Sequence, residues 1–209
     1  MENFEPIEVV DGIMVKCNVE PWKLELRPEI IKIGPNVFEG KNLETLIFAS
    51  DGLTEIGDGA FSNTLLQEVT IPDSVKYIDS YAFSLCSCLQ SVTLGKGLAF
   101  ISNGTFTKCP KLSNVVIPDN ITFIGISAFA DCESLAEIHI PDTVYHIAGY
   151  AFAGCTSLTE VTLPHSLQKI YNSAFERCTA LKKVYIPRNV MEIAKPVFAE
   201  LDVEIIEID

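Results

Sequence analysis

The residues of this chain best suited to acid–base or metal chemistry are its three histidines, His139, His146 and His165. An imidazole titrates near neutral pH and binds transition metals, so each is a candidate proton carrier or ligand. Asp142 and His165 are separated by an interval in sequence number that recurs along the chain. We therefore expect these two side chains to be neighbours, with His139 not far away. They would form a carboxylate–imidazole pair or a weak metal site, and the competing interpretation is exposed surface histidines.

No other signature of catalysis accompanies the histidines. The sequence contains no motif for an activated nucleophile, no glycine-rich phosphate loop and no dense cluster of metal ligands. We therefore predict that the chain is not an enzyme and has no cofactor. We name no catalytic, cofactor-binding or metal-binding residue.

Seven cysteines raise the question of zinc or disulfides. Zinc sites need ligand pairs at short spacing, and only Cys86 and Cys88 lie close together in sequence. Five cysteines instead recur at the same interval that separates Asp142 from His165: Cys86, Cys109, Cys132, Cys155 and Cys178. This spacing indicates one structural column of small buried hydrophobic groups with a weak S–H donor. Regularly buried free thiols favour a reducing compartment, and disulfides between neighbouring repeats also fit the spacing.

The elements that must position these residues belong to an internal repeat. Eight phenylalanines recur at a nearly constant interval, and an isoleucine lies five positions before each of them. The phenylalanines are Phe38, Phe61, Phe83, Phe106, Phe129, Phe152, Phe175 and Phe198. A fixed period of this length is typical of solenoids, in which stacked repeats bury a continuous core that no single repeat could bury alone.

Each repeat has its own local pattern. An alternating β-branched step such as Val161-Thr162-Leu163 predicts a strand of about three residues, since side chains at i and i+2 share one face. A proline such as Pro164 ends most of these strands because it cannot donate a ladder hydrogen bond. The segment from the isoleucine to the cysteine predicts a tight turn with a short helical or 3₁₀ piece that carries Phe and Cys inward.

The repeating unit C-x-x-L-x-x-V-x-I-P-x-x-V-x-x-I-x-x-x-A-F, clearest from Cys132 to Phe152, resembles the BspA-like class of leucine-rich repeats. The resemblance covers about residues 30–198. It implies an α/β repeat solenoid, a right-handed superhelix of about seven or eight rungs with short parallel strands and short helical or 3₁₀ turns. We expect residues 1–29 to form an N-terminal cap and residues 199–209 a C-terminal capping strand, all in one continuous domain.

The acidity of the chain limits its partners. It carries 28 acidic and 15 basic residues, a net charge of −13, which argues against nucleic acid. No apolar run approaches the roughly 18 residues of a membrane span, so we expect no membrane insertion. The N-terminus lacks the features of a signal peptide. The chain as it stands is thus expected in the cytoplasm as a monomer, or secreted or on the cell surface if a leader has been removed.

Two outward-facing surfaces are candidate binding sites. In such a solenoid the strand face is expected to be concave, and residues that alternate with the buried ones point out of it. Those named as partner-binding are Glu68, Thr70, Ser91, Thr93, Asn114, Glu137, His139, Glu160, Thr162, Lys183 and Tyr185. The second and weaker candidate is a lateral stripe just before the repeat isoleucines, formed by Tyr77, Phe100, Phe123 and His146. Solvated threonines on the first surface and rings that cover the core edge on the second are the alternatives.

The resemblance implies function only as protein interaction, because fold alone does not fix function. Members of the BspA-like class serve adhesion and host-surface binding as well as uncharacterised recognition. We therefore predict a non-catalytic scaffold that binds a protein partner through its concave face. The alternative is an intracellular acidic inhibitor or immunity-type protein that binds a basic toxin or nuclease, attracted by the negative field.

Overall fold

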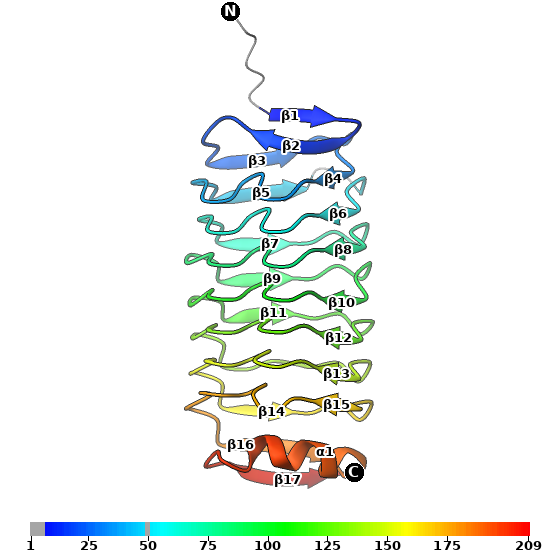
Figure 1. Cartoon of the computed structure of the whole chain (residues 1–209), viewed down its shortest axis with the longest axis vertical. Coiled ribbons are helices and arrows are strands. Elements are labelled where there is room, and N and C mark those ends of the chain that lie inside the picture. Colours follow the sequence, from blue (N-terminus) through cyan, green and yellow to red (C-terminus); the bar gives the residue numbers. More distant parts are fainter. Residues whose placement is uncertain (1–6, 49–50) are drawn as a thin grey trace, which may run out of the picture.

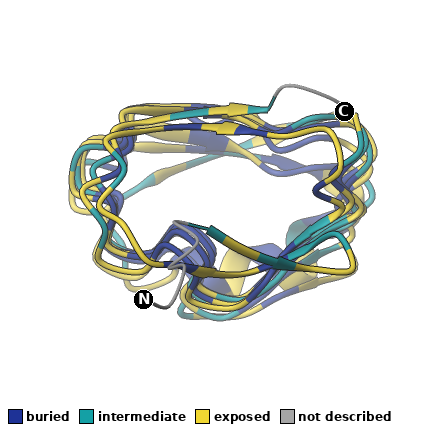
Figure 2. Ribbon diagram, turned by 90° about the horizontal axis from the view of Figure 1, so that it is seen from above, coloured by how far each residue is buried: buried dark blue, intermediate teal, exposed yellow. Residues whose placement is uncertain are grey.

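The computed structural model describes residues 7–48 and 51–209, and it is a coil of stacked rungs (Figure 1). Residues 1–6 of the expected N-terminal cap and residues 49–50 of the first rung lie outside the described residues. Eight rungs each carry one of the eight buried phenylalanines. Viewed along the stack, the rungs superpose, and buried residues recur in the same stretches of each (Figure 2). The repeat solenoid predicted from the sequence is confirmed.

Most rungs contribute two short strands, where the sequence predicted only one. The first series, which we call the long-strand face, carries the alternating β-branched step. It consists of β3 (Lys23–Leu26), β5 (Thr45–Phe48), β7 (Glu68–Thr70), β9 (Ser91–Thr93), β11 (Asn114–Val116), β14 (Glu160–Thr162), β16 (Lys183–Pro187) and β17 (Glu204–Ile208).

The second series, which we call the short-strand face, consists mostly of two-residue strands that end on the repeat isoleucine. It comprises β2 (Ile13–Cys17), β4 (Lys32–Ile33), β6 (Glu55–Ile56), β8 (Tyr77–Ile78), β10 (Phe100–Ile101), β12 (Phe123–Ile124), β13 (His146–Ile147) and β15 (Lys169–Ile170). An isoleucine after a single outward residue is too short a pattern to be recognised as a strand from the sequence alone.

Parallel pairing sets equivalent residues of successive rungs side by side. On the long-strand face Val69 pairs with Val92, and Val92 with Val115. On the short-strand face Ile124 pairs with Ile147. Because strand side chains alternate between faces, these residues point into the core while their neighbours point outward.

The phenylalanine side of the rungs from Phe38 to Phe175 is built from turns rather than the expected helical pieces, and among the described residues a 3₁₀ helix occurs there only in the last rung, that of Phe198. Its backbone N–H groups donate to the next rung: Phe61 to the carbonyl of Ala82 at 2.8 Å, and Phe129 to that of Ala151 at 2.8 Å. A helical piece would use those N–H groups internally. Left-handed residues such as Asn63 (φ 56°) and Asp131 (φ 58°) turn the amides along the stack. The phenyl rings follow at centroid spacings of 5.1 to 5.7 Å.

The five repeat cysteines form the predicted column beside these rings. All are buried, with free thiols. Each thiol donates to the carbonyl of the phenylalanine one rung earlier, as Cys132 does to Phe106 at 3.3 Å and Cys155 to Phe129 at 3.3 Å. Thr64 occupies this column in the second rung, and its hydroxyl lies 3.4 Å from the Cys86 sulfur. The column therefore joins rungs through weak hydrogen bonds as well as by packing.

Both ends of the stack are covered by strands. At the N-terminal end, β1 (Ile7–Val10) folds back antiparallel on β2. β2 and β3 pair in parallel with β4 and β5, so the stacking register extends into the expected cap. At the other end, η1 (Arg188–Val190), α1 (Met191–Ala194) and η2 (Lys195–Phe198) lead to β17, which pairs with β16 over five residues. None of the described helices is long and apolar enough to cross a membrane.

Candidate protein-binding faces

The long-strand face presents the eleven residues that the sequence assigned to partner binding. All point away from the core; Ser91 and Tyr185 are half-buried and the other nine are exposed. Parallel register lines them up in columns, so that Thr70 pairs with Thr93 and Glu160 with Lys183. The prediction that these side chains share one surface is confirmed. Whether they bind a partner remains a prediction.

One rung of this face is not hydrogen-bonded into the sheet, and we call its residues 137–140 the interrupted rung. The long-strand face consists of three sheets, β3–β5, β7–β9–β11 and β14–β16–β17, and Glu137, Ile138 and His139 lie between the last two in no strand. Val115 and Ile138, the core side chains at this break, are each 9% exposed, against 2% for Val69 within a paired sheet. The sheet therefore opens at this position.

A hollow of about 380 Å³ lies over the interrupted rung. Its walls include Asn114, Glu137, His139, Glu160 and Thr162, five of the residues predicted from the sequence. The sequence did not indicate the hollow, because the repeat pattern of this rung is intact. Only the pairing of the backbone distinguishes it from its neighbours.

A wider groove of about 830 Å³ runs where the strands meet the proline turns. Thr70, Thr93 and Val116 line one side, and turn residues such as Asp73 and Asp119 line the other. Gly95 stands here in place of the usual proline, and a Cβ at that position would lie 2.3 Å from the Pro72 carbonyl oxygen. This close approach of backbones explains the substitution, which was visible in the sequence but had no interpretation there.

The lateral stripe lies on the short-strand face, and its four predicted members are half-buried. They form two pairs of rings in edge-to-face contact: Tyr77 with Phe100, at 5.6 Å between centroids, and Phe123 with His146, at 4.9 Å. Tyr171 extends the second pair, with its ring 5.8 Å from His146. The stripe thus covers the core edge and still presents ring edges to the outside.

The packing around His146 favours its neutral form. Desolvation lowers its pKa, and the nearby Lys169 ammonium lowers it further. Its Nε2 atom is buried and has no hydrogen-bond partner among the described residues. An uncharged ring between Phe123 and Tyr171 behaves as part of the aromatic stripe rather than as a proton carrier.

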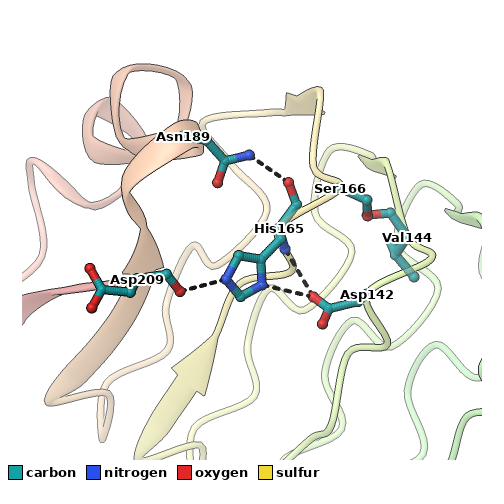
Figure 3. Close-up of polar contacts among 6 residues, drawn as sticks. All are labelled: Asp142, Val144, His165, Ser166, Asn189 and Asp209. Carbon is teal, nitrogen blue, oxygen red and sulfur yellow. Dashed lines mark hydrogen bonds and ion pairs between the residues drawn. The ribbon is translucent and has the colours of Figure 1, made fainter.

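The predicted neighbours Asp142 and His165 are in contact (Figure 3). Oδ1 of Asp142 accepts the backbone N–H of His165 at 2.9 Å and lies 3.2 Å from its Nδ1. The other ring nitrogen lies 2.8 Å from the backbone carbonyl oxygen of Asp209. Protonation lets both ring nitrogens donate, so the Asp209 carbonyl and then Asp142 raise the pKa of His165. The backbone N–H of His165 holds the pKa of Asp142 below its usual range.

This arrangement fastens a strand. Together with the Arg188–Glu207 ion pair, at 2.7 Å, the His165 ring ties the end of β17 to the preceding rungs. His139 lies on the long-strand face, near enough to contribute to the lowered pKa of Asp142, and lines the hollow over the interrupted rung. Within the described residues, no group of three or more His, Cys, Asp or Glu side chains is placed to hold a metal ion.

Comparison with known proteins agrees with the repeat geometry. A family model described as the BspA type leucine rich repeat region matches residues 13–133 and 99–209, with six copies. The chain is similar to a leucine-rich repeat protein from Bacteroides ovatus, with 30% identity and a TM-score of 0.72 over 90% of this chain and 54% of that one. No curated protein matches it.

Two further solved structures share the fold. A leucine-rich repeat protein from Eubacterium ventriosum has 24% identity and a TM-score of 0.73, over 82% of this chain and 47% of that one. The T. pallidum leucine-rich repeat protein has 21% identity and a TM-score of 0.63, over 100% and 99%. The chain spans about half the length of the Bacteroides ovatus and Eubacterium ventriosum proteins. With the family model matched from residue 13 to residue 209, the chain belongs to the BspA type leucine-rich repeat family.

Proposed function

We propose that the chain is a non-catalytic scaffold that binds a protein partner through its long-strand face. The observation that carries this proposal is the row of exposed, register-aligned side chains across β7, β9, β11, β14 and β16. A rigid surface with mixed polar groups and a half-buried tyrosine, Tyr185, suits protein recognition, in which aromatic anchors carry much of the binding free energy. Adhesion to a host surface is one form this binding would take.

Capture by the immobilised chain from native lysate and from host surface extract tests the proposal. The long-strand variant is Thr93→Arg/Tyr185→Ala, which leaves the interrupted rung intact. The matched control, Lys169→Ala/Tyr171→Ala, changes two exposed residues of the short-strand face. We expect the long-strand variant to lose a protein that the wild type and the control retain. Loss only with the control would move the site to the lateral stripe, and loss with neither would contradict both.

An acidic inhibitor of a basic protein is a second candidate, favoured by one observation. Glu68, Glu137, Glu160 and Glu204 lie in a single outward column of the long-strand face, within a chain of net charge −13. Binding driven by this field would be fast and steeply weakened by salt, because screening acts on exposed charges. Association rates of the captured partner between low and high salt separate the candidates: an unchanged rate argues against the inhibitor.

A further inference from the structure

The interrupted rung leaves backbone groups without hydrogen-bond partners between β11 and β14, which is one of two breaks in the long-strand face; the other lies between β5 and β7. Within the described part of the chain, residues 137–140 form no backbone hydrogen bond with the rung on either side, although Ala136, just before them, accepts one from Thr159 at 3.2 Å. Between the paired strands of this face such diagonal contacts are made, as from Leu94 to Val116 at 3.0 Å and from Leu163 to Tyr185 at 2.9 Å. Unpaired carbonyl groups cost free energy unless water or a ligand satisfies them.

Two like charges flank this opening. Glu137 and Glu160 occupy the same outward column on successive rungs, both exposed and both lining the hollow of about 380 Å³. Like charges directly opposite each other on neighbouring strands are destabilising. Neither carboxylate has an ion-pair partner among the described residues, and Lys183, the register neighbour of Glu160, forms no such pair either. The hollow thus combines two uncompensated carboxylates with open backbone acceptors.

We propose that this hollow receives an arginine side chain of the protein partner. The inference rests on the proposed function and specifies the chemistry of the partner. A guanidinium group carries five N–H donors in a rigid plane, enough to reach carboxylates on two rungs and a backbone carbonyl between them. It would neutralise both glutamates at once. A lysine ammonium presents three donors from a point charge and matches this spread of acceptors less well.

The test is a nuclear magnetic resonance titration of the full chain with three capped tripeptides, acetyl-Gly-X-Gly-amide, in which X is arginine, lysine or citrulline. Citrulline keeps the shape of arginine and removes its charge. We expect saturable shifts confined to the amides of residues 114, 137–140 and 160–162 with arginine, at least tenfold weaker binding with citrulline, and intermediate binding with lysine. Shifts spread over the whole acidic surface, or equal binding of arginine and citrulline, would overturn the proposal.

A matched pair of variants separates the hollow from the general field. Glu137→Gln/Glu160→Gln removes two charges at the interrupted rung, whereas Glu25→Gln/Glu204→Gln removes two from the same face outside both breaks. We expect the first variant to weaken arginine binding at least tenfold and the second to stay within twofold of the wild type. Equal losses would mean that only net charge matters. Failure here, with partner capture still lost in Thr93→Arg/Tyr185→Ala, would refute the arginine site and leave the proposed function standing.

Discussion

At the residue scale, the phenylalanine stack is the main determinant of stability. Each ring is at most 1% exposed, and every ring except Phe38 and Phe198 at the two ends contacts the rings above and below it. Full burial of an aromatic side chain contributes strongly through apolar area and dispersion. The rings in the middle of the stack have such neighbours on both sides, so a gap there cannot be filled by movement of a loop.

Replacement of Phe129 by alanine is therefore expected to cost about 3–5 kcal/mol of the free energy of unfolding, because a cavity remains between Phe106 and Phe152. Urea denaturation monitored by circular dichroism measures this cost. Ile126→Ala is the control, since that side chain is 52% exposed and its removal should change stability by less than about 0.5 kcal/mol. A comparable cost for both variants would show that the stack is not the main support.

A glycine on the same side of the molecule permits a contact that spans two rungs. Gly154 has φ +73°, and a Cβ there would lie 2.3 Å from Oδ1 of Asp131. With no side chain in the way, Arg177 reaches past it to Asp131 at 2.9 Å. We expect Gly154→Ala to destabilise the protein by about 1–3 kcal/mol through backbone strain and displacement of Asp131. Thermal denaturation beside Gly149→Ala, whose φ is not positive, checks this: the control should lose less than half as much.

At the scale of the element, the cysteine column makes stability depend on alkaline pH. Burial raises the pKa of Cys132 and of Cys178 to about 12, from an ordinary value of 9. A group whose pKa is raised by folding contributes stability that is present below its unfolded pKa and is lost as the pH rises through the folded value. The column should therefore weaken between about pH 9 and pH 12.

Urea midpoints measured at pH 8 and pH 10.5 are expected to fall more for the wild type than for Cys132→Ala/Cys178→Ala. The paired comparison removes the contributions of lysine and tyrosine residues, which titrate in both proteins. Equal falls would contradict a buried thiol column. Titration of unfolded protein should meanwhile find all seven thiols free.

The contact that joins His165 to Asp142 and to the end of β17 weakens in two pH ranges. It weakens as the pH rises, when His165 loses its proton, and in acid, when Asp142 gains one. His165, with its pKa raised above 6.5, loses its contribution as the pH rises through that raised pKa, and Asp142, with its pKa below 3.8, loses its own only in stronger acid. The contact is thus complete between these ordinary values. Titration by nuclear magnetic resonance should show a pKa above 6.5 for His165, and Asp142→Asn should lower it. An unshifted value in that variant would exclude the pairing.

The whole molecule shows which features a repeat pattern can and cannot predict. The spacing of Phe, Ile and Cys predicted the solenoid, the core columns and the contact between Asp142 and His165, because parallel register turns one period of the repeat into adjacency. It did not predict the second strand series or the turns in place of helices. The turns depend on a left-handed backbone at residues such as Tyr81 and Lys108, and tyrosine and lysine are not typical residues for positive φ.

The candidate site could be predicted only in part for a related reason. Outward residues follow from strand alternation, so the long-strand face was identifiable. The interrupted rung was not, since Glu137-Ile138-His139 fits the pattern of its neighbours and differs only in hydrogen bonding. Pairing between rungs is a tertiary property that no local sequence pattern encodes.

Because each rung contacts mainly its neighbours, removal of a whole period should be tolerated. Deletion of residues 122–144 rejoins equivalent positions and is expected to give a folded, shorter solenoid with a cooperative transition. Deletion of residues 122–133 breaks the register and should give an unfolded chain. Circular dichroism and urea unfolding distinguish them, and a collapse of both would show that the rungs are not interchangeable.

The turns on the phenylalanine side also make the molecule electrically polar. The N–H groups of the phenylalanines from Phe38 through Phe152 each donate to a carbonyl of the later rung, so these amide dipoles point the same way along the edge. Summed backbone dipoles act as partial charges at the ends of a stack, as in a helix. Here the positive end lies at the C-terminal rungs, where the sequence places Glu200, Asp202, Glu204 and Glu207. The acidic residues of the C-terminal segment thus lie at the end of the stack to which these dipoles give a positive partial charge.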